Sequence, residues 1–435
     1  MKNLLIIAPR FPPINAADMH RVRQSLPFFR DMGWEPHVLA VDPVYVHGTR
    51  DDLLLQTVPD NARIDHVPAI PAKWTRLFGV GSLALRSLGF YLRAGNRILR
   101  RGEIDLVYFS TTAFPVIVLG RYWKYRYDIP YVIDLQDPWR LDHYLDQPVD
   151  ERPPKFWGAY GMHRLLEPIA MTAVDGIISV SQDYCDTLAD RYDNISPSDC
   201  TIIPFGASED DFDVIDEVTP ANPFFDPSDG IINIVYVGRG GHDMALAARG
   251  LFRAFTRGLR ETPELFGKVQ IDFVGTSYAK AGEGEKTFAP LATSYGVADH
   301  VNEQPARIGY FQALNLMREA DMLVVVGSED PSYTASKIYP CILSRTPLLA
   351  IFNGESSVVN ILSETGAGEV VSFLGGASDE TDEEALASRI LETWRPMLQK
   401  LPYAPEVNWK AFEPYTAREM TRRQVEVFDR VVDES

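Results

Sequence analysis

The sequence predicts an α/β protein that contains two domains, each built on an open parallel sheet. Short, continuously apolar runs alternate with longer segments in which apolar residues recur at helical spacing. Continuous apolar runs are typical of strands buried on both faces, and strand–helix alternation is typical of parallel sheets with right-handed crossovers. Because 435 residues exceed one hydrophobic core of ordinary size, we expect two domains.

The apolar runs give the expected strands in chain order. Each run is short enough for a strand, and the segments between the runs are long enough for a covering helix. In the first half the runs are 4–7, 37–41, 106–109, 131–133, 176–180 and 201–203. In the second half they are 231–237, 269–274, 322–326, 348–351 and 370–373.

A change in composition separates the two halves. Residues 204–230 are acidic, rich in Pro and Gly, and without clear periodicity, which is typical of a linker. After Pro405 the pattern predicts a terminal helix with Phe412 and Phe428 among its apolar positions. We therefore expect an N-terminal domain at 1–204, a linker at 205–230, a C-terminal domain at 231–404, and a helix within 405–435 that packs back on the N-terminal domain.

Composition excludes several classes of protein. The apolar run at the N-terminus ends at Pro9, too early for a signal peptide, and no later run approaches the ~20 apolar residues of a membrane span. Cys185, Cys200 and Cys341 are scattered, which disfavours a disulfide framework or a structural zinc site. The net charge of -18 disfavours nucleic acid as a partner. We expect a cytoplasmic protein.

Lys337 opens the otherwise apolar segment "KIYPCILSRTPLLA" and is the first candidate site residue. Open parallel sheets bind ligands beyond the carboxyl ends of their strands, and Lys337 falls on such a loop. Ser336 is expected to cap the following helix, so that first-turn amides and the ammonium would bind a diphosphate together. The alternative is a lysine that extends from the first turn into solvent.

The loop "YVGRGGHDM", residues 236–244, is the second candidate. Gly238, Gly240 and Gly241 allow close approach of a ligand to the backbone, and Arg239 offers a fork that suits phosphate oxygens. A nicotinamide fingerprint would require glycine at Asp243. The alternative is a tight strand–helix turn that binds no ligand.

These two loops, in this order, resemble the second domain of the GT-B glycosyltransferases, specifically family 4. The resemblance extends into the first half through "LLIIAPRFPPINAADMH", "IPYVIDLQDPW", "ISVSQDYCDTL" and "TIIPFGASEDDF", and covers nearly the whole chain. It implies GT-B architecture, in which two Rossmann-like parallel-sheet domains face each other across a crevice. It also implies that Lys337 and Arg239 neutralise the diphosphate of a nucleotide-sugar as it leaves, without a metal or other cofactor. The implied donor-binding residues are Gly238, Gly240, Gly241, Ser332, Ser336, Tyr339 and Glu355.

Asp134 and Asp137 follow the strand that begins at Tyr131 and are the candidates for the acceptor side. A carboxylate there could orient an acceptor hydroxyl or stabilise positive charge on the sugar. Asp137 is preferred because Pro138 and Trp139 place it on a loop; the alternative is an aspartate that forms a turn before proline. The other residues expected to line the crevice are Pro13, Ala16, Ala17 and Trp139.

The sequence departs from the family pattern at several positions. The two family glutamates fall on Ser332 and Pro340, and the family histidine near Asp137 falls on Gln136. The glycine pair of the first loop is replaced by Ala16-Ala17. Either catalysis has been lost, or the donor is held by one of Glu329, Asp330 and Glu355.

Residues 74–101 suggest a peripheral contact with the inner face of a membrane. The segment carries arginines without any acid among leucine, phenylalanine and tyrosine residues. Such a basic amphipathic helix suits a negatively charged leaflet. The alternative is a crossover helix that covers the first sheet. The arginines are Arg76, Arg86, Arg93, Arg97, Arg100 and Arg101.

Together with these features, the resemblance implies a metal-independent glycosyltransferase that retains anomeric configuration, as the family does. It would move a sugar from a nucleotide diphosphate donor to a glycan or lipid-linked acceptor. Two alternatives stay open: a nucleotide-sugar epimerase on the same fold, and a non-catalytic relative that binds a glycan or a protein.

Overall fold

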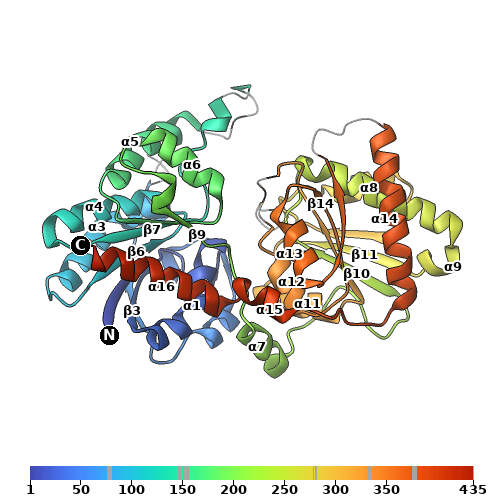
Figure 1. Cartoon of the computed structure of the whole chain (residues 1–435), viewed down its shortest axis with the longest axis horizontal. Helices are drawn as coiled ribbons and strands as arrows, with labels where there is room; N and C mark the ends of the chain where they lie inside the picture. The colour runs from blue at the N-terminus through green and yellow to red at the C-terminus, as the bar shows by residue number, and fades with distance from the viewer. Residues whose placement is uncertain are drawn as a thin grey trace. The chain divides into compact units, whose positions relative to one another are not determined.

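The computed structural model describes the chain except for residues 76–80, 146–147, 150–151, 153–155, 278, 280–281, 332, 334, 375–379 and 435. The chain forms two compact units (Figure 1). The first unit comprises Met1–Gly206 together with Ala417–Ser435, and the second comprises Ala207–Thr416. Both chain ends therefore belong to the first unit.

The first unit is built on a seven-stranded parallel sheet in the order β5-β3-β1-β6-β7-β8-β9. The order reverses between β1 and β6, so the loops that follow these two strands diverge at the carboxyl edge of the sheet. A separate antiparallel pair joins β2 (Ile14–Asn15) to β4 (Thr49–Arg50). The sheet strands are β1 (Lys2–Ile7), β3 (Trp34–Val41), β5 (Arg63–Val67), β6 (Leu106–Ser110), β7 (Tyr131–Leu135), β8 (Gly176–Ser179) and β9 (Cys200–Ile202).

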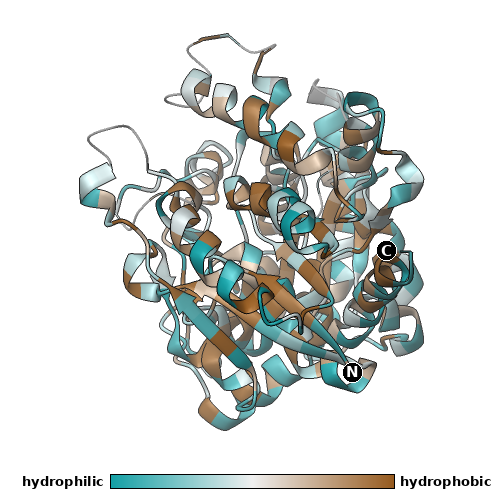
Figure 2. Ribbon diagram, turned by 90° about the vertical axis from the view of Figure 1, so that its left-hand side faces the viewer, coloured by the Kyte–Doolittle hydropathy of each residue, from teal (hydrophilic) through white to brown (hydrophobic). Residues whose placement is uncertain are grey.

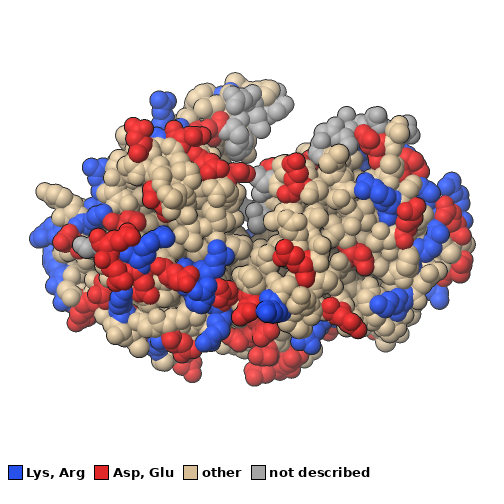
Figure 3. Space-filling view, in the orientation of Figure 1, with Lys and Arg blue, Asp and Glu red and all other residues tan. Residues whose placement is uncertain are grey.

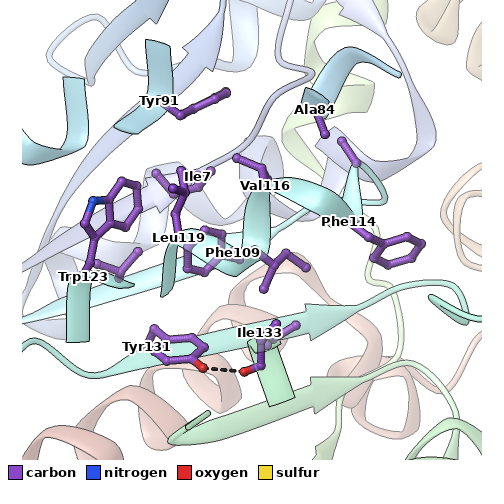
Figure 4. Packing of buried hydrophobic residues seen from close by; sticks show 14 of the residues in the cluster. Ile7, Ala84, Tyr91, Phe109, Phe114, Val116, Leu119, Trp123, Tyr131 and Ile133 are labelled. Carbon is purple, nitrogen blue, oxygen red and sulfur yellow. Dashed lines mark hydrogen bonds between the residues drawn. The ribbon is translucent and has the colours of Figure 1, made fainter. Parts of the chain in front are cut away.

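Helices cover both faces of this sheet. Successive side chains of β1 point to opposite faces, so Leu4 and Ile6 join one apolar cluster and Leu5 and Ile7 join the other. Figure 4 shows the second cluster, in which the Tyr131 hydroxyl donates to a backbone carbonyl of α5. The helices are α1 (His20–Phe29), α2 (Ala72–Thr75), α3 (Leu83–Leu99), α4 (Val118–Tyr127), α5 (Phe156–Met171), α6 (Gln182–Arg191) and α16 (Ala417–Asp433).

The second unit has a six-stranded parallel sheet in the order β12-β11-β10-β13-β14-β15, which is the Rossmann order and reverses between β10 and β13. Its strands are β10 (Ile232–Val237), β11 (Val269–Val274), β12 (Val301–Gln304), β13 (Met322–Val326), β14 (Leu348–Asn353) and β15 (Glu369–Phe373). Its helices are α7 (Asp210–Val218), α8 (Ala245–Glu261), α9 (Pro263–Phe266), α10 (Phe288–Ser294), α11 (Tyr310–Glu319), α12 (Ile338–Leu343), α13 (Ser357–Thr365), α14 (Glu380–Lys400) and α15 (Trp409–Phe412).

The predicted α/β class and both parallel sheets are confirmed, and every apolar run forms a strand. Two sheet strands were not predicted, β5 and β12, and each forms one edge of its sheet. Neither has a continuous apolar run, because an edge strand is covered less completely: β5 is largely exposed, and β12 alternates buried and exposed residues. In Figure 2 the helices carry both colours, as expected of elements that pack on a sheet with one face and meet solvent with the other.

Helix α3 uses the apolar residues of segment 74–101 inside the first unit. Tyr91 and Ile98 are buried in the core cluster, and Leu88, Phe90 and other partly buried residues pack against it. Arg86 is buried and donates to the carbonyls of Ile70 and Tyr45. These contacts favour the crossover-helix alternative over a membrane-facing helix, since the apolar face is already covered; Arg76 lies outside the described residues. On the face drawn in Figure 3, basic side chains are interspersed with acidic ones.

The C-terminal helix α16 completes the core on one face of the first sheet. In Figure 1 it runs beside α1. Phe428 is fully buried, with its ring centroid 4.9 Å from that of Tyr108, 5.7 Å from Trp34 and 6.1 Å from Phe29. A residue at the far end of the sequence therefore anchors aromatic side chains from β3, β6 and α1.

We predict that Phe428→Ala lowers the free energy of unfolding of the first unit by about 3–5 kcal/mol, because it leaves a cavity among three aromatic rings. The measurement is urea denaturation followed by tryptophan fluorescence. Tyr125→Ala is the control, since Tyr125 is 91% exposed and its loss should change stability by less than about 0.5 kcal/mol. Equal effects of the two substitutions would show that α16 does not complete this core.

Candidate functional site

The carboxyl edge of the second sheet gathers the loops with most of the predicted site residues. Parallel strands end at the same edge, and the order reversal between β10 and β13 separates the loops that follow them. The amide of Glu329, after β13, donates to the carbonyl of Asp243, after β10, over 2.8 Å. The two loops are thus joined directly at the point where such sheets bind ligands.

Arg239 is held in an ion pair within its own loop. Its Nη1 lies 2.9 Å from Oδ1 of Asp243, and its Nη2 lies 2.6 Å from Oδ2. The guanidinium carbon lies 4.5 Å from the ring centroid of Tyr333. Burial would raise the pKa of Asp243, but hydrogen bonds from Arg239 and Ser328 outweigh burial and lower that pKa. The cation predicted to meet a diphosphate is therefore already neutralised.

The three glycines of this loop make room for neighbouring side chains. A Cβ at Gly238 would lie 2.6 Å from the Tyr236 hydroxyl, which donates to the Arg239 carbonyl. A Cβ at Gly240 would lie 2.6 Å from Thr287 Oγ1, and one at Gly241 would lie 2.3 Å from Asp243 Oδ1. These contacts support the tight-turn alternative, and a donor-binding role for the glycines stays a prediction.

Lys337 carries a positive charge without a carboxylate partner among the described residues. Its Nζ lies 6.0 Å from the ring centroid of Tyr310. Burial, followed by the positive charge of Arg307, lowers the pKa of Lys337 to about 8. The predicted cap was one residue too early: α12 begins at Ile338 with Lys337 at the cap position, and Ser336 does not cap it. The Ile338 amide donates to the carbonyl of Ala335, which closes a turn over residues 336–337 just before the helix.

Arg307 is a candidate that the sequence interpretation missed. It follows β12, and Tyr310, which begins α11 three residues later, lies under the Lys337 ammonium. Glu303, on β12 shortly before Arg307, has a buried side chain. Its carboxylate accepts four hydrogen bonds, two of them from the backbone amides of Phe288 and Ala289 at the start of α10. The signal available in the sequence was an arginine just after a strand, but β12 itself was not predicted.

The other predicted donor residues are dispersed. Tyr339 is buried and stacks on Tyr415 at 5.3 Å, so its ring belongs to the core of the unit. Glu355 is exposed, and its amide donates to Asn353 Oδ1. Asn353 in turn donates to the Glu329 carbonyl, which links the loops after β13 and β14. Ser332 lies outside the described residues.

Asp134, in the first unit, is a buried structural carboxylate. Its side chain has 0% exposed surface, and its Oδ2 lies 3.0 Å from Nε of Arg21, which is equally buried. Ser110 and Gln136 each donate to the same oxygen over 2.7 Å. Asp134 therefore has no surface on which to meet an acceptor, and Gln136 is one of the donors that compensate its burial.

Asp137, two residues beyond β7, is exposed. Desolvation by the surrounding protein, and then the negative charge of Asp18, raise its pKa to about 6. Asp18 was not predicted; it accepts from Arg10 over 2.8 Å and from the amide of Thr112 over 3.1 Å. Since Arg10 and Thr112 follow β1 and β6, Asp18 joins the two loops at the order reversal of the first sheet.

The remaining candidates of the first unit occupy different environments. Trp139 is buried and stacks on Phe114 at 5.4 Å, which makes it part of the core rather than of an open surface. Pro13 is buried, and its carbonyl accepts from Asp51 over 2.8 Å. Ala16 is half-buried, and Ala17 is exposed at the start of a 3-10 turn. Among these, only Ala16 and Ala17 leave surface for a ligand.

Many solved structures match the chain, and three of them illustrate matches over almost all of its length. Sucrose-phosphate synthase from Thermosynechococcus elongatus matches at 14% identity with a TM-score of 0.57, covering 100% of both chains. Anabaena HepE in complex with UDP and glucose matches at 15% identity and 0.57, covering 98% of this chain and 99% of its own. WaaG, a glycosyltransferase involved in lipopolysaccharide biosynthesis, matches at 13% identity and 0.55, covering 99% of each. No curated protein sequence matches.

The chain has the GT-B fold. Residues 22–211 also match the model of Glycosyltransferase Family 4, so the resemblance read from the sequence is confirmed. That match covers less than half of the chain, nearly all of it in the first unit, and does not reach the loops of Arg239 and Lys337. Within the described part of this GT-B chain, no helix is long and apolar enough to cross a bilayer. The described side chains likewise include no His, Cys, Asp and Glu group arranged to hold a metal ion.

We predict that Arg307→Gln raises the pKa of Lys337, because it removes the positive charge that disfavours a second cation nearby. Labelling with an amine reagent across a pH series, read peptide by peptide in a mass spectrometer, gives the midpoint for Lys337. The midpoint should lie near 8 in the unsubstituted protein and higher in the variant. Arg307→Lys keeps the charge and should keep the low midpoint; an unchanged midpoint in Arg307→Gln would contradict the assignment.

Proposed function

We propose that this GT-B protein is a glycosyltransferase that moves a sugar from a nucleotide diphosphate donor to a glycan or lipid-linked acceptor. The fold is shared with proteins whose names identify them as glycosyltransferases, and Anabaena HepE was crystallised with UDP. The family match of residues 22–211 points the same way. If the acceptor is lipid-linked, we propose that the protein acts in the cytoplasm, at the inner face of the membrane.

The observation that carries this proposal is the charge of Lys337 at the carboxyl edge of the second sheet, for which the described residues supply no carboxylate partner. With a pKa of about 8, the ammonium is roughly nine-tenths protonated at pH 7. Arg307 adds a second positive charge, and the Lys337 ammonium lies 6.0 Å from the ring centroid of Tyr310. Two neighbouring cations stabilise the charge that a diphosphate develops as it departs, so the chemistry needs no metal ion.

In the proposed mechanism the acceptor attacks from the face that the diphosphate leaves, and anomeric configuration is retained. The departing phosphate oxygen accepts the proton of the acceptor hydroxyl, so no dedicated base is required. Asp137 is the carboxylate proposed to orient that hydroxyl, since it is exposed while Asp134 is sealed in the core. Its negative form also stabilises positive charge on the sugar ring.

We predict that Lys337→Ala lowers kcat by about 10²–10³-fold, the usual effect of removing one preorganised charge donor, while changing stability by less than about 1 kcal/mol. Thermal unfolding with millimolar UDP, GDP, ADP or dTDP, without metal, should show a raised midpoint for one diphosphate that Lys337→Ala abolishes. Lys410→Ala, which removes one exposed lysine from the same unit, is the matched control. Equal losses of activity and of stability in Lys337→Ala would contradict the proposed role.

We predict an acidic limb near pH 6 in the pH profile of kcat/KM. The pKa of Asp137 is raised to about 6, so its carboxylate form, which the mechanism needs, is lost as the pH falls through that value. Asp137→Asn should have low activity at every pH and no limb at 6. An identical limb in wild type and Asp137→Asn would exclude Asp137 as the titrating group.

A second candidate, a non-catalytic protein that binds a glycan or another protein, is favoured by one observation. Arg239, the second cation of the implied mechanism, is neutralised by Asp243. Diphosphate binding without turnover of any nucleotide-sugar, in a protein with intact fold, would support this candidate over the transferase.

A further inference from the structure

The Arg239–Asp243 ion pair of the second unit is more exposed than the Arg10–Asp18 ion pair of the first unit, and each follows the first strand of its sheet. In the first unit, Arg10 pairs with Asp18 over 2.8 Å, and the Asp18 side chain is only 4% exposed. In the second unit, the side chains of Arg239 and Asp243 are 26% and 40% exposed. Water and solutes reach the second pair, so its carboxylate can be exchanged for another anion, whereas Asp18 is fixed in the interior.

The loop is shaped to close the Arg239–Asp243 pair. Gly241 lies between the two residues, and a Cβ there would be 2.3 Å from Asp243 Oδ1 and 2.7 Å from Arg239 Nη1. The backbone of Asp243 is fixed by the amide of Glu329, and its carboxylate accepts from the hydroxyl of Ser328. Because Gly241 has no side chain, the Asp243 carboxylate and the Arg239 guanidinium have room to form their ion pair.

A diphosphate that approaches Arg239 needs the N–H groups that Asp243 occupies. Both Nη atoms donate to the carboxylate, which uses the paired geometry that phosphate oxygens prefer. If phosphate oxygens instead approached the remaining N–H groups, they would lie close to the negative charge of Asp243 and be repelled. In either geometry Asp243 opposes phosphate binding at Arg239, while Lys337 has no such competitor among the described residues.

We propose that Asp243 sets the affinity of this chain for nucleoside diphosphates, by occupying the Arg239 guanidinium until phosphate displaces it. This inference rests on the proposed function, since it concerns the donor's diphosphate. Lys337 receives the phosphate first, and Arg239 joins it after leaving Asp243. A competing structural role, in which Asp243 merely orients Arg239 toward phosphate, predicts a change of the opposite sign.

The test is titration calorimetry of UDP with the full chain and with Asp243→Asn, which keeps the shape of the side chain and removes its charge. Asp243→Asn should bind UDP about tenfold more tightly, as expected when a close competing charge is removed from a partly buried site. Uridine, which has no phosphate, should bind both proteins equally. Unfolding midpoints without ligand, together with a second variant, Asp243→Ser, show whether any change reflects damage to the fold.

Glu261→Gln is the matched control. It also removes one acidic partner of arginines, Arg257 and Arg395, and it lies at the opposite end of α8, about 25 Å away by the helical rise. It should leave UDP affinity unchanged. If wild type binds UDP and Asp243→Asn binds it equally or more weakly, the inference is wrong and the proposed function stands. If neither protein binds UDP, GDP or ADP, the proposed function fails and the inference fails with it. Binding by Asp243→Asn alone would support both.

Discussion

The structure depends on a constraint that parallel sheets impose on polar side chains. Strands covered by helices on both faces have no water beside them, so a polar group on a strand must be compensated by other protein groups or lie beyond the strand's end. Asp134 and Glu303 illustrate the first outcome: Ser110 and Gln136 donate to Asp134, and the backbone amides of Phe288 and Ala289 donate to Glu303. Arg239, Arg307 and Asp137 illustrate the second, since each lies two or three residues beyond the end of its strand.

The same arrangement recurs in both units. In each, the loop after the first strand carries an arginine paired with an aspartate, and a backbone amide of the loop beyond the order reversal donates to that aspartate. Burial separates the two instances. In the first unit the aspartate is buried, and its ion pair holds two loops together. In the second unit the aspartate borders solvent, where we propose that phosphate can replace it.

The sequence predicted the parts of this protein that depend on local pattern. Apolar runs located the central strands, and the Lys337 segment fell at the carboxyl edge as expected. Edge strands β5 and β12 were not predicted, because partly exposed strands lack a continuous run of apolar residues. Tyr339 and Trp139 are buried through stacking on Tyr415 and Phe114, distant partners that no local pattern reveals. The sequence shows that Arg239 and Asp243 are four residues apart. It does not show that the loop turns so that their side chains form an ion pair.

Helix α16 has a consequence for the order in which the chain acquires its structure during synthesis. Phe428, which covers Trp34 and Tyr108, is translated more than three hundred positions after the strands that carry these two residues. The second unit, whose residues are contiguous, can reach its final form while the first still exposes an aromatic surface. Chaperones that bind apolar surface would therefore have more time to bind the first unit of the nascent protein than the second.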